Sequence, residues 1–188
     1  RVSLGGPVFD VEKLSWLNGM WIREELSDEQ LADRLQEWAL NRDTLMAFLP
    51  FAKQRMETLS DIAPLGNYLV SGMLPITADQ LTASGIEDET LIEVLQFSLW
   101  RLEAIQNWQR DTIFETLKSV ADSMGIKPFL APLFIAIAGS SASISVMDSM
   151  NLLGADMSRA RLRHAIDVLG GIGKKKLKKM EKAYQQLS

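Results

Sequence analysis

Histidine supports most hydrolytic triads and many zinc sites, and this sequence contains one, His164. It follows Arg159, Arg161 and Arg163, and no second histidine is available to share a metal ion or a proton. We therefore interpret His164 as a surface residue near the C-terminal end of a helix, where positive charge is favoured. It predicts neither a catalytic site nor a metal site.

The acidic residues also lack a catalytic arrangement. Glu24, Glu25, Asp28 and Glu29 cluster where a helix is expected to begin, and the helix dipole favours negative charge at that end. The sequence has no cysteine, which excludes disulfides and thiolate metal sites and is compatible with a reduced cytoplasmic compartment. The residue types therefore predict a binding protein rather than a catalyst.

A glycine- and lysine-rich stretch could bind phosphate. Residues 169–180 read LGGIGKKKLKKM, but Val168 and Lys175 stand where a phosphate loop needs glycine and a hydroxyl residue. Two interpretations remain: a helix-hairpin-helix turn whose glycine N–H groups hold a nucleic-acid phosphate, or, as we favour, a flexible hinge before a solvated basic helix. Either one predicts salt-dependent RNA contacts by Lys174, Lys175, Lys176, Lys178 and Lys179.

Charge is unevenly distributed along the chain. Residues 171–188 carry six lysines and one glutamate, a net charge of +5, which leaves −9 for residues 1–170. An acidic body disfavours phosphate binding over the whole surface, whereas a basic end favours it there. The most apolar run, residues 129–138, is far shorter than the roughly 20 residues of a membrane span. No membrane partner is expected.

Apolar residues recur with a helical period almost throughout, which predicts an all-α fold. The stripes are Leu31, Leu35, Trp38 and Ala39; Leu91, Leu95, Leu99, Leu102 and Ile105, on a helix of about residues 88–107; and Leu162, Ala165, Ile166 and Leu169. Trp38 and Trp108 lie on or beside stripes and are expected in the core, whereas Trp21 is the tryptophan least committed to it.

The helix ends have recognisable signals. Ser27 with Gln30, and Thr77 with Gln80, have the spacing of capping boxes, and Asp156 is placed to cap the helix that carries the third stripe. Helices are expected to end at three glycines that follow apolar runs: Gly125, Gly139 and Gly154. Residues 63–76, rich in glycine and proline, are predicted to be a linker between two helical units.

The most specific stretch is residues 5–23, which read GGPVFDVEKLSWLNGMWIR. It resembles the Phe-Asp-x-x-Lys-Leu-x-Trp-x-Asn-x-x-Tyr/Trp-Ile phrase of bacterial glutamyl-tRNA synthetases, which lies after the catalytic half in the region that contacts the tRNA stem. Residues 55–62, RMETLSDI, resemble the family's Arg-x-x-Thr-Leu segment in the first anticodon-binding subdomain. Residues 132–139 and 152–154, PLFIAIAG and LLG, resemble the second subdomain. The resemblance covers about residues 1–170 and leaves the lysine-rich end outside.

The resemblance implies roles for particular residues. Arg55 matches the family arginine that reads the third anticodon letter in enzymes that refuse glutamine tRNA, and a guanidinium fork suits base acceptors. An alternative for Arg55 is a helix-surface arginine paired with Glu57 or Asp61. Ser143 and Ile144, with Val146 beyond, match the loop that contacts the middle anticodon base, although the family's proline is absent. Phe134 replaces a family arginine and is expected to stack on a base or to pack in the core.

The resemblance also implies an architecture of two small helical anticodon-binding subdomains. Residues 1–26 would end the stem-contact region, 27–76 would form the first subdomain and linker, 77–170 the second, and 171–188 a basic tail. The chain begins with Arg1 in mid-phrase, as an excised fragment would, and the ATP-binding signatures are expected upstream. The fragment alone should be inactive and carry no cofactor, because ATP and Mg²⁺ would belong to the missing catalytic domain.

The implied partner is glutamate-specific tRNA, bound by a cytoplasmic monomer with no DNA partner. The alternative is a non-catalytic helical module whose RNA or protein binding depends on the basic tail.

Overall fold

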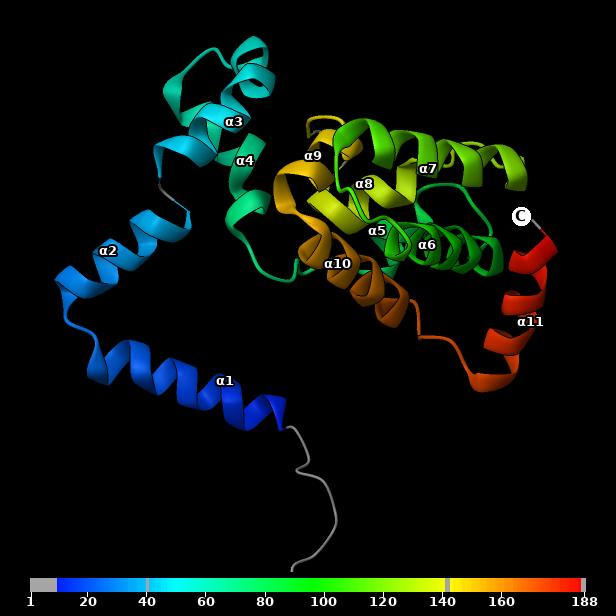
Figure 1. The fold of residues 1–188 in the computed structure, drawn as a ribbon, viewed down its shortest axis with the longest axis horizontal. Coiled ribbons are helices and arrows are strands. Elements are labelled where there is room, and N and C mark those ends of the chain that lie inside the picture. The colour runs from blue at the N-terminus through cyan, green and yellow to red at the C-terminus, as the bar shows by residue number, and fades with distance from the viewer. Residues whose placement is uncertain (1–9, 40, 141–142, 187–188) are drawn as a thin grey trace, which may run out of the picture. The chain divides into compact units, whose positions relative to one another are not determined.

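The computed structural model describes residues 10–39, 41–140 and 143–186. Every regular element among these residues is helical, which confirms the all-α prediction (Figure 1). The α-helices are α1 (Val11–Met20), α2 (Asp28–Trp38), α3 (Arg42–Ala52), α4 (Ile62–Val70), α5 (Ala78–Thr82), α6 (Asp88–Glu103), α7 (Arg110–Met124), α8 (Ala131–Ala138), α9 (Val146–Leu153), α10 (Ala155–Val168) and α11 (Lys174–Gln186). A π turn spans Trp21–Glu25, and 3₁₀ turns span Lys53–Arg55 and Leu59–Asp61.

The chain forms two compact units, Arg1–Met46 and Ala47–Ser188, with the boundary inside α3. None of the described residues of the first unit is buried, and Trp38 is 63% exposed. The prediction that Trp38 lies in the core is therefore wrong, because no second layer among the described residues of this unit covers its apolar stripe. Residues 5–9 of the family-like stretch lie outside the described residues. The predicted divisions after residues 26, 76 and 170 stay predictions.

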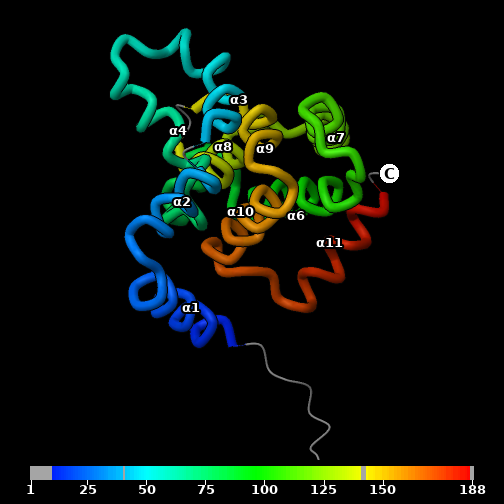
Figure 2. The backbone as a smooth tube through the Cα atoms, turned by 60° about the vertical axis from the view of Figure 1, so that its left-hand side comes forward, coloured from blue at the N-terminus to red at the C-terminus, as the bar shows by residue number. Residues whose placement is uncertain are grey.

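The second unit holds the main hydrophobic core. Helix α10 packs against α6, α8 and α9, and α7 packs against α6 and α9 (Figure 2). The predicted stripe on α6 is confirmed, since Leu91, Leu95, Leu99 and Leu102 are all buried. Trp108 packs beside this core and donates from Nε1 to the carbonyl of Met150 at 2.9 Å. Its predicted place at the core is therefore confirmed.

Most of the predicted helix ends are present. Ser27 with Gln30 and Thr77 with Gln80 form reciprocal capping boxes, and α7 and α8 end at the left-handed glycines Gly125 and Gly139. The predicted Asp156 cap is wrong. Gly154 precedes α10 and also ends α9, while Asp156 lies in the first turn of α10, where its charge still suits the helix dipole.

The predicted linker is mostly helix. Helix α4 occupies residues 62–70 and ends before a short extended segment that leads to α5. A Cβ atom added to Gly66 would lie 2.7 Å from Cε1 of Phe48, so the glycine allows α4 to approach that ring closely. The glycine that suggested a linker is therefore required for packing.

The basic helix at the lysine-rich end is not fully solvated, and Gly170 and Gly171 before it do not offer free N–H groups. The N–H groups of Gly170 and Gly171 donate to the carbonyls of Asp167 and Ile166, both at 2.9 Å, and close the end of α10. They are not free for a phosphate, which removes the basis of the helix-hairpin-helix interpretation at these two positions. Helix α11 buries Met180 against the main core. It is a docked amphipathic helix.

Within the described ranges, no helix is both long and apolar enough to cross a bilayer. The same residues contain no group of three or more histidine, aspartate or glutamate side chains that could hold a metal ion.

The docking of α11 predicts a difference between its two faces. Met180 is 1% exposed, so Met180→Ala should lower the free energy of unfolding by about 2 kcal/mol and speed hydrogen exchange along α11. Lys178→Ala, on the exposed face, should change stability by less than about 0.5 kcal/mol. Urea unfolding with exchange mass spectrometry measures both. Equal, small effects of the two substitutions would contradict the docked arrangement.

Candidate functional site

The structure brings Arg55 and Ser143 together, although they lie 88 positions apart in the sequence. Arg55 ends the 3₁₀ turn Lys53–Arg55, and its guanidinium donates a hydrogen bond to the carbonyl oxygen of Ser143. The side chain of Arg55 is otherwise exposed. Two positions that the sequence assigned to separate subdomains are therefore in contact within the second unit.

The remaining candidate residues are less accessible. The hydroxyl of Ser143, a residue 9% exposed, donates to the carbonyl of Ile144 at 3.0 Å. Ile144 is buried in a small cluster with Phe48 and Ala52, and Val146 is buried in the main core. In this conformation the side chains of Ile144 and Val146 do not face solvent, so RNA would reach them through the backbone. Whether these positions contact RNA stays a prediction.

Phe134 follows one of its two expected alternatives in this conformation. It is partly buried and packs against the main core. Stacking of Phe134 on a base stays a prediction.

The turn after Arg55 is shaped by Asp61. The Asp61 carboxylate accepts hydrogen bonds from the backbone N–H groups of Thr58 and Glu57, both at 2.7 Å, and from the Thr58 hydroxyl at 3.0 Å. These bonds, chiefly those from Thr58 and Glu57, lower the pKa of Asp61 below its ordinary value, because they stabilise the charged form. The same turn presents Leu59, whose side chain is 88% exposed.

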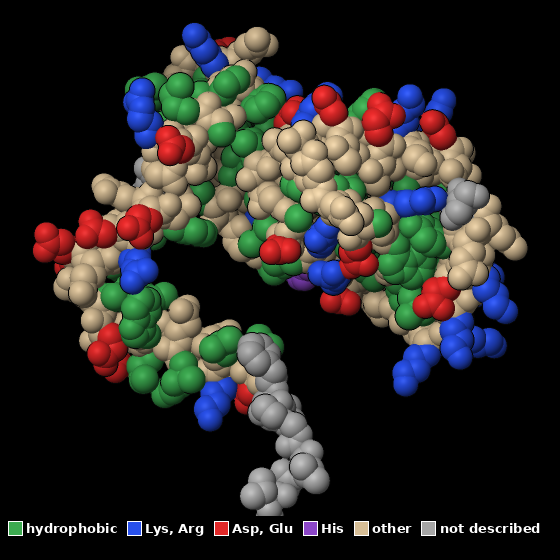
Figure 3. Space-filling view, viewed as in Figure 1, with side chains coloured by type: hydrophobic (Ala, Val, Ile, Leu, Met, Phe, Trp, Pro, Cys, Tyr) green, Lys and Arg blue, Asp and Glu red, His purple; other side chains and the backbone are tan. Residues whose placement is uncertain are grey.

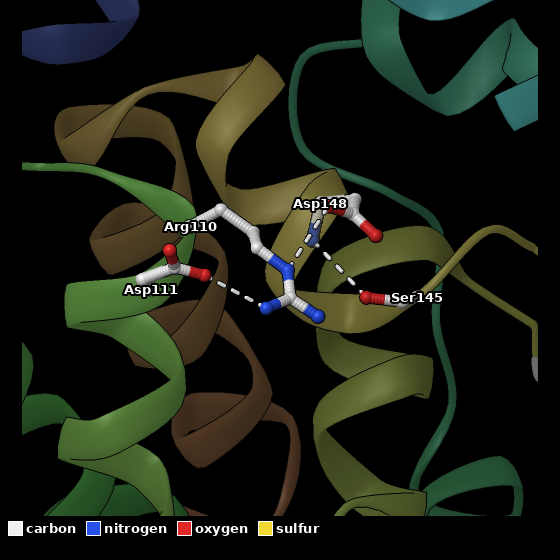
Figure 4. A network of polar contacts seen from close by, with 4 residues as sticks. All are labelled: Arg110, Asp111, Ser145 and Asp148. Carbon is white, nitrogen blue, oxygen red and sulfur yellow. Dashed lines mark hydrogen bonds and ion pairs between the residues drawn. The ribbon is translucent and has the colours of Figure 1, made fainter. Parts of the chain in front are cut away.

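Arg110 fixes the end of the Ser143 loop where it enters α9. The hydroxyl of Ser145 caps α9 by accepting from the N–H of Asp148 at 3.3 Å. The Asp148 carboxylate in turn lies 3.5 Å from Nε of Arg110. Another nitrogen of the same guanidinium, Nη1, lies 2.8 Å from the Asp111 carboxylate (Figure 4). The loop is thus held to the first turn of α7.

Helix α4 is held to the rest of the unit by buried polar contacts. The hydroxyl groups of Tyr68 on α4 and Ser149 on α9 lie 2.7 Å apart and share a hydrogen bond. Burial raises the pKa of Tyr68 above its ordinary value, so the phenol stays neutral at physiological pH.

Arg161 of α10 is the largest fully buried side chain of the described residues, at 0% exposure. Its guanidinium donates to the carbonyls of Tyr68 at 2.6 Å and Gly72 at 2.9 Å, and also to those of Ser71 and Ile137. These carbonyls lie at or just beyond the C-terminal ends of α4 and α8, where the helix dipoles favour a positive charge. Arg161 therefore fixes the relative positions of the two helices that neighbour the Arg55 and Ser143 segments.

The sequence interpretation overlooked Arg161 because it treated the residue only as one of three arginines that precede His164. The missed signal was its place on the buried face of α10, three residues after Ser158 and four before Ala165, both of which are buried. The interpretation of His164 as a surface residue also needs correction. It is partly buried, and its Nε2 lies 3.1 Å from the carbonyl of Leu74.

Comparison with known proteins shows the family of this chain. A family model described as an anticodon-binding domain matches residues 30–166, which is most of the chain. The chain belongs to this family. Both members of the Arg55–Ser143 contact lie inside the matched part of the anticodon-binding domain.

Similar sequences extend beyond the matched domain. The glutamate–tRNA ligases of Cellvibrio japonicus and Saccharophagus degradans are 58% and 57% identical to all of this chain, which spans 38% of each ligase. The resemblance to glutamyl-tRNA synthetases is thereby confirmed, and the matched portion is the C-terminal one, without the catalytic part. The expectation that the resemblance ends near residue 170 is wrong, because these alignments include the lysine-rich end.

A solved structure has a related fold. The glutamate tRNA ligase from Elizabethkingia meningosepticum, determined in complex with its amino acid, superposes with a TM-score of 0.62. The match covers 87% of this chain and 34% of that chain, at 18% identity. At that identity the likeness supports the fold of the anticodon-binding domain and nothing finer.

The buried guanidinium of the anticodon-binding domain predicts a large stability effect. Arg161→Met keeps much of the side-chain length but leaves several buried carbonyls without donors, each at a cost of about 1–3 kcal/mol. We expect the free energy of unfolding to fall by about 3 kcal/mol or more in urea titrations.

The control is Arg163→Met on the same helix, which removes an exposed pair with Glu103. Surface pairs contribute about 0–1 kcal/mol, so this change should be small. If both variants lost a similar free energy of unfolding, the buried hydrogen bonds of Arg161 would not be a major contribution to stability.

The pKa of Asp61 predicts acid sensitivity of the turn beside Arg55. Because its folded pKa is lowered, the carboxylate stabilises the turn above the unfolded value of about 3.9. That contribution is lost as pH falls through the lower, folded pKa. The amide NMR shifts of Glu57 and Thr58 should therefore titrate with a midpoint below about 3.9, and Asp61→Asn should abolish the transition. A midpoint at or above that value would contradict the hydrogen-bonded turn.

Proposed function

We propose that this chain recognises the anticodon of glutamate-specific tRNA, as the C-terminal part of a glutamate–tRNA ligase. The observation that carries the proposal is the contact between Arg55 and Ser143. It brings together two of the positions for which the family resemblance implies anticodon contacts, the exposed Arg55 and the backbone of Ser143. Membership of the anticodon-binding domain family and the names of the similar ligases support the same function.

Arg55 supplies the chemistry of discrimination in this proposal. A guanidinium has five N–H donors in a rigid fork, and the bond to the Ser143 carbonyl leaves others free. Because Arg55 is exposed, those donors can bind acceptors on the third anticodon base. The backbone of residues 143–144 would contact the middle base.

The chain's wider role follows from the same proposal. Ligation of glutamate to tRNA, with ATP and Mg²⁺, would take place in the part of the ligase that these residues do not contain. We expect a cytoplasmic protein that is monomeric and inactive in ligation when isolated.

Replacing Arg55 tests the proposal. Arg55→Gln should reduce the preference for glutamate tRNA over glutamine tRNA by about 10-fold, because a good bidentate contact contributes about 1–3 kcal/mol of discrimination. Lys53→Gln removes an exposed positive charge from the same 3₁₀ turn and should leave the preference unchanged. Fluorescence anisotropy with the two labelled tRNAs measures the ratio of dissociation constants.

Thermal unfolding of each variant is the accompanying control, since Arg55 also binds Ser143. The proposal fails if the wild-type protein binds both tRNAs equally. The assignment of discrimination to Arg55 fails if Arg55→Gln and Lys53→Gln change the ratio alike.

A further inference from the structure

Helix α11 is rigidly attached to the second unit through its inner face. The Tyr184 ring lies 5.5 Å from the Phe97 ring and 5.0 Å from the Trp100 ring, both on α6. The Arg101 guanidinium lies 5.2 Å from the Tyr184 ring, and Met180 is buried in the main core. The orientation of α11 about its axis is therefore fixed.

The outer face of α11 is a ridge of exposed lysines, which we call the lysine ridge. It consists of Lys174, Lys175, Lys178, Lys179 and Lys182. Figure 3 shows the basic side chains gathered along this edge of the molecule. None of the ion pairs found among the described residues involves a lysine of α11. Within the described part of the chain, the ridge thus presents its charges to solvent without an ion-pair partner.

These lysines are unfavourable for the helix that carries them. Positive charges in the first turn oppose the helix dipole, and α11 has no acidic residue there. Lysines four residues apart, such as Lys174 and Lys178, also repel each other along the helix. A bound polyanion would relieve both effects. The arrangement is costly for folding alone and favourable for binding negative charge.

The lysine ridge is separate from the Arg55–Ser143 surface. Helices α4 and α11 lie on opposite sides of the second unit in both views of the backbone (Figures 1 and 2). The anticodon bases held at Arg55 would therefore not reach α11. A ligand that contacts both surfaces must be long, or the two surfaces bind different segments of it.

We propose that the lysine ridge is a second RNA-binding surface that holds the sugar-phosphate backbone without reading bases. From Lys174 to Lys182 the ridge is about 12 Å long at 1.5 Å per residue. That length matches several consecutive phosphates of a nucleic-acid strand. Lysine ammonium groups bind phosphates as point charges and do not distinguish bases. The inference rests on the proposed function for the identity of the RNA, but not for the location of the surface.

Paired substitutions test the ridge without disturbing the inner face. The ridge variant combines Lys178→Gln with Lys182→Gln, and glutamine keeps nearly the same helix propensity. Its charge-matched control combines Lys118→Gln with Lys127→Gln, two exposed lysines of the same unit. Removing residues 171–188 altogether would uncover the core beneath Met180, so deletion is not used.

Binding is measured with labelled glutamate tRNA and with the same tRNA carrying an altered anticodon, between 50 and about 200 mM KCl. The ridge variant should bind both RNAs about 10-fold more weakly at about 0.1 M salt. A plot of log affinity against log salt has a negative slope, and its magnitude should decrease by about 1.4–1.8 in the ridge variant. Each of the two lost phosphate contacts contributes about 0.7–0.9 to that magnitude. The control variant should change affinity less than about 3-fold and keep the slope.

The outcomes separate this inference from the proposed function. An unchanged slope in the ridge variant, or an equal loss in the control, would overturn the ridge even if wild-type protein preferred the correct anticodon. Equal wild-type binding of both tRNAs, with a weakened ridge variant, would overturn anticodon reading and leave the ridge standing. If the ridge variant kept tRNA affinity but lost binding to phosphatidylserine vesicles or to polyglutamate, the surface would serve a lipid or an acidic protein, and the RNA assignment would fail.

Discussion

The buried guanidinium of Arg161 is the interaction on which the geometry of the second unit depends. A charge removed from water is costly unless hydrogen bonds and dipoles replace its hydration. Here the replacement comes from backbone carbonyls at the ends of two helices rather than from a carboxylate. Burial accordingly lowers the pKa of Arg161, while the bonds remain those of a charged donor. Because the acceptors lie at or just beyond the ends of α4 and α8, one side chain of α10 sets the spacing between the two helices.

That spacing has a direct bearing on the candidate site. Helix α4 follows the turn that carries Arg55, and α8 precedes the loop that carries Ser143. The Tyr68–Ser149 bond and the Arg110–Asp148 contact hold the same segments from other directions. The surface residues that would meet RNA are therefore positioned by groups that RNA does not touch.

The sequence predicted the features that local rules determine. Helical periodicity identified α6 and its buried leucines, and capping chemistry located the starts of α2 and α5. Prediction from the sequence failed where the structural role of a residue depends on a partner far away in the chain. Gly66 looked like a linker signal because the Phe48 ring against it is 18 positions away. Arg161 was seen only as one of three arginines near His164, because its acceptors are backbone atoms far away in the sequence. Motif resemblance named Arg55 and Ser143, yet only the fold could show that they touch.

The hydrogen bond between Arg55 and Ser143 has a consequence for how selection would operate. One N–H group of the guanidinium already donates to a carbonyl in the free protein, so the side chain is oriented before an RNA arrives. A base with well-placed acceptors would bind the remaining donors without displacing that bond, and a base without them would leave the arginine on its carbonyl. Incorrect RNAs would then lack a favourable contact rather than meet a repulsive one. The arginine would be placed for selection before binding, and little conformational entropy would be lost when the correct base arrives.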